Sequence, residues 1–278
     1  MTDRLLLVGA TGFLGSAVAA RLADRQPIAL VRSSSDRSML PTGMVQRVGD
    51  LAEPLPLADV ATLVYCASMG FGNVPGLIRQ LGDAGVSRAL FISTTAIFTS
   101  LPSTSRAVRL EAEAAVQASA ADWTILRPTM IYGSARDRNV SRLLRFLKRW
   151  PAFPLCANAL WQPIYVDDLA DAVIAALDSP GTSRKAYNVA GPQPLTFADL
   201  VRTAAKAVGR RILFLPVPLE AAVVAARLTG VVTPEQIRRL AEDKTFPITE
   251  AARDFNFAPR SFADGVRLEA ISLGLTRP

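Results

Sequence analysis

Hydrophobic positions in the first 130 residues fall into short, continuous runs that are separated by longer amphipathic stretches. Continuous runs indicate strands buried on both faces, whereas amphipathic stretches indicate helices. The predicted strands are residues 4–8, 28–31, 44–48, 62–66, 89–93 and 124–126, and the predicted helices are residues 16–24, 74–84 and 105–119. Because the strands alternate with helices and crossovers are right-handed, we expect an α/β fold with a doubly wound parallel sheet.

The pattern changes after Gly133 and becomes mainly helical. We predict helices at residues 140–149, 167–177, 196–208, 219–229, 234–240 and 261–273, a Pro-rich loop at 150–163 and a strand at 186–189. Thr196 and Thr233 are expected N-caps, and Pro234 suits the first helical position. We therefore expect one α/β domain at 1–130 and a small, mainly helical lobe at 131–278, with segments 160–190 returning to the α/β core.

The sequence VGATGFLG, from Val8 to Gly15, stands between the first predicted strand and the first predicted helix. Gly9 permits a tight turn, Gly12 lets the backbone approach phosphates, and Gly15 lets the helix pack closely on the strand. A helix N-terminus in this place binds a dinucleotide pyrophosphate. A plain βα turn rarely needs three spaced glycines, so we predict a Rossmann-type dinucleotide-binding domain. The other residues of the predicted turn are Thr11, Phe13 and Leu14.

The amino-acid composition limits which catalytic and metal sites the protein can have and where in the cell it is expected. The chain has 278 residues, half of them hydrophobic, and no apolar run long enough to span a bilayer. It begins directly with a predicted strand, so we expect no signal peptide and a cytoplasmic protein. Cys66 in a predicted strand is expected in the core, and neither it nor Cys156 has metal-ligand spacing. Histidine is absent, which excludes Ser-His triads and imidazole acid–base chemistry, and we predict no metal site.

The chain is basic, with a formal charge of +7, and six of its cations gather between Arg136 and Arg149. A solvated helix face is the favoured interpretation of this cluster, and a site for a phosphate-bearing molecule is the alternative. The cluster lacks interleaved aromatic residues, and the chain has no nucleic-acid-binding motif. We therefore expect a small-molecule partner, anionic ones included, and neither nucleic acid nor membrane.

Several further segments, in order along the chain, resemble one family. The sequence resembles the extended and atypical short-chain dehydrogenase/reductases, the NAD-dependent epimerase/dehydratase group. The likeness is carried by the glycine turn, by GDL at 49–51, FISTT at 91–95, LRPTMIYG at 126–133, PIYVDDLA at 163–170, YNVAG at 187–191 and DFNFAPRSFADG at 254–265. This resemblance implies that Asp50 and Leu51 contact adenine and that Pro128 lies along the nicotinamide. It also places Ala67 and Ser93 among the residues that bind the cofactor.

The family's chemistry rests on a Tyr-x-x-x-Lys pair and a Ser or Thr, and this chain lacks the pair. Its four tyrosines are followed four positions later by Met69, Arg136, Leu169 and Gly191. By resemblance, Ser105 takes the tyrosine position, Arg109 the lysine position and Thr94 that of the hydroxyl residue. Thr94 is then expected to hydrogen-bond the reacting oxygen, and Arg109 to hold ribose hydroxyls without titrating. Tyr132 and Arg136 have the right spacing with arginine, but they lie in a different segment.

The second predicted strand is followed by Arg32 and three serines. An NAD site would have Asp or Glu there for the ribose hydroxyls, whereas arginine with neighbouring hydroxyls suits a 2′-phosphate. We therefore favour NADP over NAD, although Arg32 could also simply begin a solvated loop.

Two functions remain open from the sequence. The first is an NADP-dependent oxidoreductase or epimerase-like enzyme that acts on a small or sugar-nucleotide-like molecule. The second is a non-catalytic NADP-binding sensor or scaffold, which resembles NmrA-like regulators and the accessory subunit of respiratory complex I. Asp167 and Asp168 are expected to support a helix N-terminus rather than to catalyse. We expect a monomer or a homodimer, with the helix at 105–119 as the candidate dimer face.

Overall fold

The computed structural model describes residues 4–101, 103–229 and 233–277, which form two compact units. The first unit runs to Pro128 and also contains Val166–Val189 and Ile248–Phe257. The second unit contains Thr129–Tyr165, Ala190–Pro247 and the chain from Ala258 onward. The chain thus returns twice to the α/β unit, and the return at Ile248–Phe257, which holds helix α9 (Thr249–Phe255), is absent from the prediction.

The first unit is built on a seven-stranded sheet in the order β11-β6-β5-β4-β1-β2-β3, and every neighbouring pair is parallel. The strands are β1 (Arg4–Val8), β2 (Ile28–Val31), β3 (Val45–Val48), β4 (Val60–Tyr65), β5 (Arg88–Ile92), β6 (Asp122–Pro128) and β11 (Lys185–Val189). This confirms the predicted doubly wound sheet. The strand order reverses between β1 and β4, and ligands of such sheets bind at this point, beyond the carboxyl ends of the strands.

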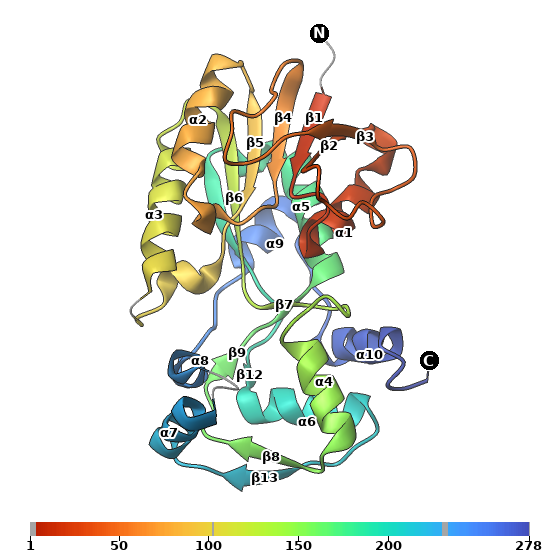
Figure 1. Ribbon diagram of the computed structural model, residues 1–278, viewed down its shortest axis with the longest axis vertical. Coiled ribbons are helices and arrows are strands. Elements are labelled where there is room, and N and C mark those ends of the chain that lie inside the picture. Colours follow the sequence, from red (N-terminus) through yellow and green to blue (C-terminus); the bar gives the residue numbers. More distant parts are fainter. Residues whose placement is uncertain (1–3, 102, 230–232, 278) are drawn as a thin grey trace. The chain divides into compact units, whose positions relative to one another are not determined.

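Helices cover both faces of this sheet (Figure 1). On one face α1 (Phe13–Arg21) packs against α5 (Val166–Asp178), and on the other α2 (Val74–Asp83) packs against α3 (Thr104–Gln117). The continuous apolar strands follow from this arrangement, since Leu6 and Leu7 point to opposite faces and both are fully buried. Asp167, in the first turn of α5, pairs with Arg21 of α1 at 3.3 Å, in keeping with a structural role.

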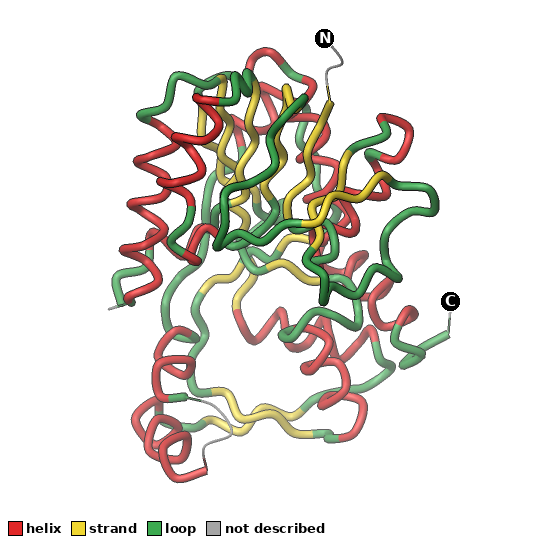
Figure 2. The backbone as a smooth tube through the Cα atoms, turned by 45° about the horizontal axis from the view of Figure 1, so that its top comes forward, coloured by secondary structure: helices red, strands yellow, loops and turns green. Residues whose placement is uncertain are grey.

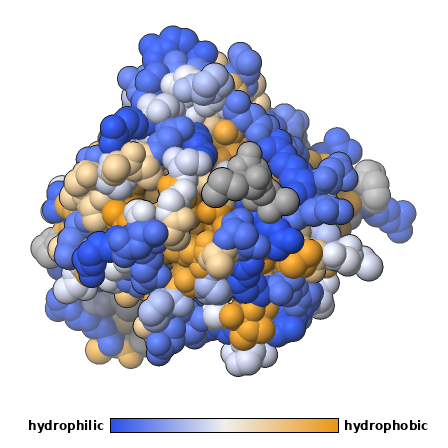
Figure 3. All heavy atoms as spheres, turned by 90° about the horizontal axis from the view of Figure 1, so that it is seen from above, coloured by the Kyte–Doolittle hydropathy of each residue, from blue (hydrophilic) through white to orange (hydrophobic). Residues whose placement is uncertain are grey.

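The second unit has a core formed by α4 (Val140–Arg149), α6 (Phe197–Ala207) and α10 (Phe262–Ser272). It also contains α7 (Leu219–Thr229) and α8 (Pro234–Arg239). The predicted N-caps are confirmed, because the Thr196 hydroxyl accepts from the Asp199 N–H and Thr233 forms a capping box with Gln236. Figure 3 views the molecule from the end at which Figure 1 draws β1–β5, and charged and polar residues cover most of that face, with hydrophobic residues gathered toward its middle.

Three short two-stranded ladders complete the second unit. They pair β7 (Ile131–Tyr132) with β10 (Ile164–Tyr165), β9 (Leu160–Trp161) with β12 (Leu195–Thr196), and β8 (Ala152–Leu155) with β13 (Leu213–Pro216). The prediction of a plain loop at 150–163 is therefore wrong, since β8 and β9 lie within it. Their partners are distant in sequence, and β8 carries Pro154 because it pairs on one side only. Within the described ranges we find no helix that is both long and apolar enough to cross a bilayer.

Candidate functional site

The turn after β1 has a steric requirement at each of its three glycines. Gly9 has a φ of +80°, a conformation that L side chains rarely adopt. The Gly12 N–H donates to the Gly9 carbonyl at 2.9 Å, and a Cβ at Gly12 would lie 3.0 Å from that oxygen. A Cβ at Gly15 would lie only 1.9 Å from the same oxygen. The loop after β1 can therefore pack against the first turn of α1 only because these three positions have no side chain.

The N-terminus of α1 has the character of an anion site. Gly12 is its N-cap and provides no side-chain cap, and the first turn holds no acidic residue. The first backbone N–H groups of a helix have no acceptor within the helix, and the helix dipole places positive charge at this end. The predicted residues Phe13 and Leu14 begin the helix here, and Leu14 is buried. The glycine cradle and this helix end fit the pyrophosphate of a dinucleotide.

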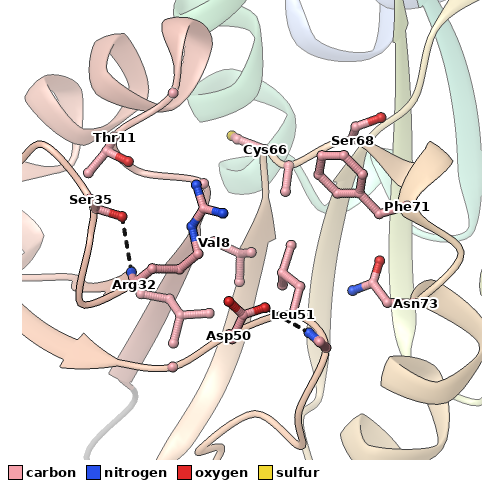
Figure 4. A pocket seen from close by; sticks show the side chains of 16 residues that line it. Val8, Thr11, Arg32, Ser35, Asp50, Leu51, Cys66, Ser68, Phe71 and Asn73 are labelled. Carbon is pink, nitrogen blue, oxygen red and sulfur yellow. Dashed lines mark hydrogen bonds between the residues drawn. The ribbon is translucent and has the colours of Figure 1, made fainter.

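A cavity of about 560 Å³ opens at this turn, at the point where the strand order reverses (Figure 4). It is lined by seven of the predicted cofactor residues, namely Gly9, Thr11, Gly12, Arg32, Asp50, Leu51 and Ala67. Residues after β1, β2, β3 and β4 thus meet in one place, because parallel strands deliver their carboxyl ends to the same edge. The predicted residues outside this lining are Phe13, Leu14, Gly15, Ser93, Thr94, Arg109 and Pro128.

Arg32 and Asp50 lie at the end of the cavity formed by the segments after β2 and β3. The Arg32 N–H donates to the Ser35 hydroxyl at 3.1 Å, which folds the loop back on itself. In Figure 4 the Arg32 guanidinium extends to the side of the cavity that carries Thr11. None of the ion pairs among the described residues uses Arg32. The Asp50 carboxylate accepts from the Ala52 N–H at 3.0 Å and so holds the turn after β3.

The segment after β4 contributes residues that the sequence prediction missed, apart from Ala67. They are Cys66, Ser68, Phe71 and Asn73, and the Tyr65 hydroxyl anchors this segment by donating to the Asn73 side chain at 3.1 Å. Cys66 was expected inside a strand in the core, but β4 ends at Tyr65 and the half-buried thiol lines the cavity. Burial raises the pKa of this thiol to about 12, so it is not a nucleophile at neutral pH.

The residues that stand for the family's Tyr-Lys pair meet on α3. The Arg109 guanidinium donates to the Ser105 hydroxyl at 2.9 Å, one helical turn away. The same guanidinium lies against Gly70, where a Cβ would be 3.4 Å from Arg109 Nε. Arg109 thus contacts the segment after β4 that borders the cavity, although it does not itself line the cavity. Neither Ser105 nor Arg109 can exchange a proton as a Tyr-Lys pair does.

The hydroxyl residues after β5 are held by local contacts. The Thr94 hydroxyl accepts from the Ala96 N–H at 3.2 Å and so caps the 3-10 helix Thr95–Phe98. The buried Ser93 hydroxyl has no hydrogen-bond partner in the described part of the chain. Pro128 ends β6, and its carbonyl accepts from the Thr95 hydroxyl at 3.3 Å. These contacts place Ser93 and Pro128 at the carboxyl ends of adjacent parallel strands.

Tyr132, which has the family's spacing to Arg136, lies in the interior of the second unit. Its side chain is 1% exposed and packs against Tyr165 and Phe262, with ring centroids 5.4 and 5.2 Å away. A Cβ at Gly265 would lie 2.2 Å from the Tyr132 hydroxyl oxygen, so this glycine makes room for the ring. Tyr132 is therefore a core residue of the second unit.

Comparison with known proteins agrees with this geometry. Residues 9–145 match a family model described as NAD(P)H-binding. The chain is 29% identical to an NAD(P)H azoreductase of Xenophilus azovorans over 248 residues, which cover 84% of this chain and 83% of that enzyme. It is 23% identical to a UDP-glucose 4-epimerase of Vibrio cholerae over 264 residues, covering 79% and 80%. These matches support an atypical, epimerase-like family of NAD(P)-binding short-chain dehydrogenase/reductases. It is 31% identical to the mitochondrial NADH dehydrogenase 1 alpha subcomplex subunit 9 of Arabidopsis thaliana, across 79% of this chain but only 62% of that subunit.

Solved structures show the same fold as this chain. Gox2253 superposes with a TM-score of 0.81 at 23% identity, covering 98% of both chains. A triphenylmethane reductase of Citrobacter sp., solved with NADP(H), gives 0.75 at 21% identity, covering 95% of this chain and 99% of that one. MoeE5, solved with UDP-glucuronic acid and NAD, gives 0.76 at 18% identity over 98% and 99%. These neighbours share the fold of this chain, and they include both NAD and NADP(H) complexes.

Proposed function

We propose that this protein is an NADP-dependent reductase that delivers hydride to a small acceptor without a tyrosine–lysine proton relay. The observation that carries the proposal is the position of Arg32 at the end of the β2 strand, in the cavity wall and without a carboxylate partner among the described residues. An acidic residue in this position would repel a 2′-phosphate and bind ribose hydroxyls instead. Arginine and the neighbouring serines supply cationic and hydroxyl donors to a phosphate.

The residues around the predicted reaction centre favour reduction over epimerisation. When bound, the cofactor supplies a hydride. Epimerases and alcohol dehydrogenases of this family also need a base that removes a hydroxyl proton, and the Ser105–Arg109 pair provides none. An acceptor with a conjugated, electron-poor system can take hydride first and a proton from water afterwards. The relatives named azoreductase and triphenylmethane reductase support this class of acceptor.

In this proposal several of the predicted residues have a defined task. Gly9, Gly12 and Gly15 with the N-terminus of α1 hold the pyrophosphate, and Asp50 with Leu51 borders the adenine. Arg109 orients the nicotinamide ribose, while Thr94 donates a hydrogen bond to the acceptor. The remaining predicted contacts are Thr11, Phe13, Leu14, Ala67, Ser93 and Pro128.

A second candidate function is a non-catalytic NADP-binding sensor or scaffold. The missing Tyr-Lys pair and the 31% identity to a complex I subunit favour it. A sensor needs only different affinities for the reduced and oxidised cofactor, whereas a reductase must turn over. A nucleotide-sugar ligand, as bound in MoeE5, would suit the sensor, which needs no electron-poor acceptor. The cytoplasmic location and the choice between monomer and homodimer stay predictions from the sequence.

The test is a calorimetric titration with NADPH, NADP, NADH and NAD, followed by assays of NADPH oxidation with azo dyes and with triphenylmethane dyes. We expect NADPH to bind best and Arg32→Ala to weaken it about tenfold to hundredfold, with little change for NADH. Arg37→Ala, an exposed arginine in the same loop, is the matched control. Preference of the wild type for NADH would refute the role of Arg32. Tight NADPH binding without oxidation by any acceptor would favour the sensor.

A further inference from the structure

The ladder of β8 and β13 in the second unit has no polar side chain on either face. It reads AFPL against LFLP, and Leu213 pairs with Ala152 while Leu215 pairs with Pro154. Figure 2 shows these strands side by side as a separate two-stranded ribbon. Phe153 and Phe214 point inward and pack on the core of the unit. Leu213 and Leu215 point outward and are 65% and 47% exposed, although the solvent face of a sheet is normally polar.

Exposed aromatic residues extend this apolar face at the end of α4. Phe146 is 38% exposed and meets Phe153 of β8 edge-on, with ring centroids 5.8 Å apart. Trp150 ends the helix and is 53% exposed. The Leu213 N–H donates to the Pro151 carbonyl at 2.9 Å, which holds the start of β13 next to Trp150 at the end of α4. We call the surface formed by Trp150, Leu213 and Leu215 the apolar face, and Phe146 borders it.

Cations border the apolar face, and in the described part of the chain none of them forms an ion pair with a carboxylate. The Arg210 guanidinium donates to the Lys148 carbonyl at 3.2 Å, which holds the end of α4 next to the start of β13. These cations are Lys148, Arg149, Arg210 and Arg211, and all four are exposed. Segments 138–166 and 200–219 contain no Asp or Glu at all.

We propose that the apolar face docks on a membrane surface that contains anionic phospholipid. Leucine and tryptophan side chains enter the headgroup region, and the bordering cations meet lipid phosphates. A second copy of this chain is a poor occupant of the face, because symmetric pairing would bring the two sets of cations together. The proposal revises the expectation from the sequence that the protein has no membrane partner. That expectation rested on the lack of a long apolar run and on the cation cluster at 136–149. Docking on a membrane is independent of the proposed reductase activity.

The three tryptophans make the contact measurable in the whole protein. Trp123 and Trp161 are 7% and 9% exposed, whereas Trp150 is half-exposed within the apolar face. We expect vesicles of phosphatidylcholine with phosphatidylglycerol to sediment the protein and shift its tryptophan emission to the blue. Vesicles of phosphatidylcholine alone should do neither. The absence of sedimentation with anionic vesicles at low ionic strength would overturn the proposal.

Two double variants test the two components separately. Leu213→Glu with Leu215→Glu should abolish both sedimentation and the blue shift, and Lys148→Glu with Arg149→Glu should weaken sedimentation by at least about thirtyfold. Arg79→Glu with Arg267→Glu changes the net charge equally at exposed sites on α2 and α10 and is the matched control. Equal weakening by the control pair would overturn the proposal by showing non-specific attraction. If the wild type is a dimer and the double leucine variant is a monomer, the proposal is also overturned. The apolar face would then bind a second copy of the chain.

Discussion

A buried carboxyl group in the second unit allows a prediction with a defined pH dependence. Glu269 of α10 is 0% exposed, and the backbone N–H of Gly133 favours its charged form. Its neighbour Asp137 is 4% exposed and accepts from the Asn139 and Ser141 N–H groups at 2.7 and 2.9 Å. Burial, and then repulsion and hydrogen bonding by Asp137, raise the pKa of Glu269 to about 9. This raised pKa favours the protonated form of Glu269 at pH 7, in which its O–H can donate to the Asp137 carboxylate.

Folding must protonate Glu269, so the free energy of unfolding falls as the pH rises. In the unfolded chain Glu269 has an ordinary pKa near 4.5 and is ionised at pH 7, so folding must take up a proton. A folded-state pKa above the unfolded value gives stability that is complete below about pH 4.5 and is lost progressively up to about pH 9. Each pH unit in this window costs about 1.4 kcal/mol. At pH 7 the cost is about 3 kcal/mol, and at pH 5 it is below about 1 kcal/mol.

Glu269→Gln removes the proton uptake and keeps the shape and a donor toward Asp137. We expect the variant to be more stable than the wild type by about 2–3 kcal/mol at pH 7, since burying the amide uses part of the gain. For a chain of 278 residues this is a rise of about 3–5 °C in Tm. The difference should shrink toward pH 5 and grow toward pH 8.

Urea unfolding followed by circular dichroism at several pH values measures this difference. Glu111→Gln, on the exposed face of α3, is the control and should leave the pH dependence unchanged. A Glu269→Gln variant that is less stable than the wild type, by an amount independent of pH, would refute the reasoning. That result would mean that Glu269 is ionised and satisfied in the folded protein.

Two further predictions concern the first unit. Gly15→Ala should destabilise the protein by about 2–3 kcal/mol and abolish dinucleotide binding, because its Cβ would lie 1.9 Å from a backbone oxygen. Gly82→Ala in α2, whose Cβ would meet nothing within 4 Å, should instead stabilise the protein by about 0.5–1 kcal/mol. Thermal melts and NADPH titration distinguish the two variants. Equal effects of the two substitutions would contradict the steric argument. Glu113→Ala should cost about 3–5 kcal/mol in denaturant unfolding, since it leaves the half-buried Arg127 without the carboxylate that accepts from it at 2.6–3.1 Å. Asp199→Ala, which breaks an exposed pair with Arg202, should cost less than about 1 kcal/mol, and a comparable loss would count against burial as the cause.

Much of the first unit could be predicted because its signals are local. Each predicted strand of the sheet overlaps the observed one, since an apolar run next to a glycine turn and an amphipathic stretch specifies strand, turn and helix within a few residues. The glycine turn and Arg32 could be placed at the cavity by the same rule, because parallel strands end at one edge. Cys66 was misplaced because the end of β4 depends on where its neighbours stop pairing.

The sequence by itself determined the alternation of strands and helices, the dinucleotide turn and the loss of the Tyr-Lys pair. Only the tertiary structure decided that β8 pairs with β13, that α9 belongs to the first unit, and that Glu269 faces Asp137. These features join segments far apart in the chain, and each depends on which surfaces remain to be buried once the local elements have formed. Short segments such as β8 carry no periodic signal of their own, so their structure is set by the partner on which they pack.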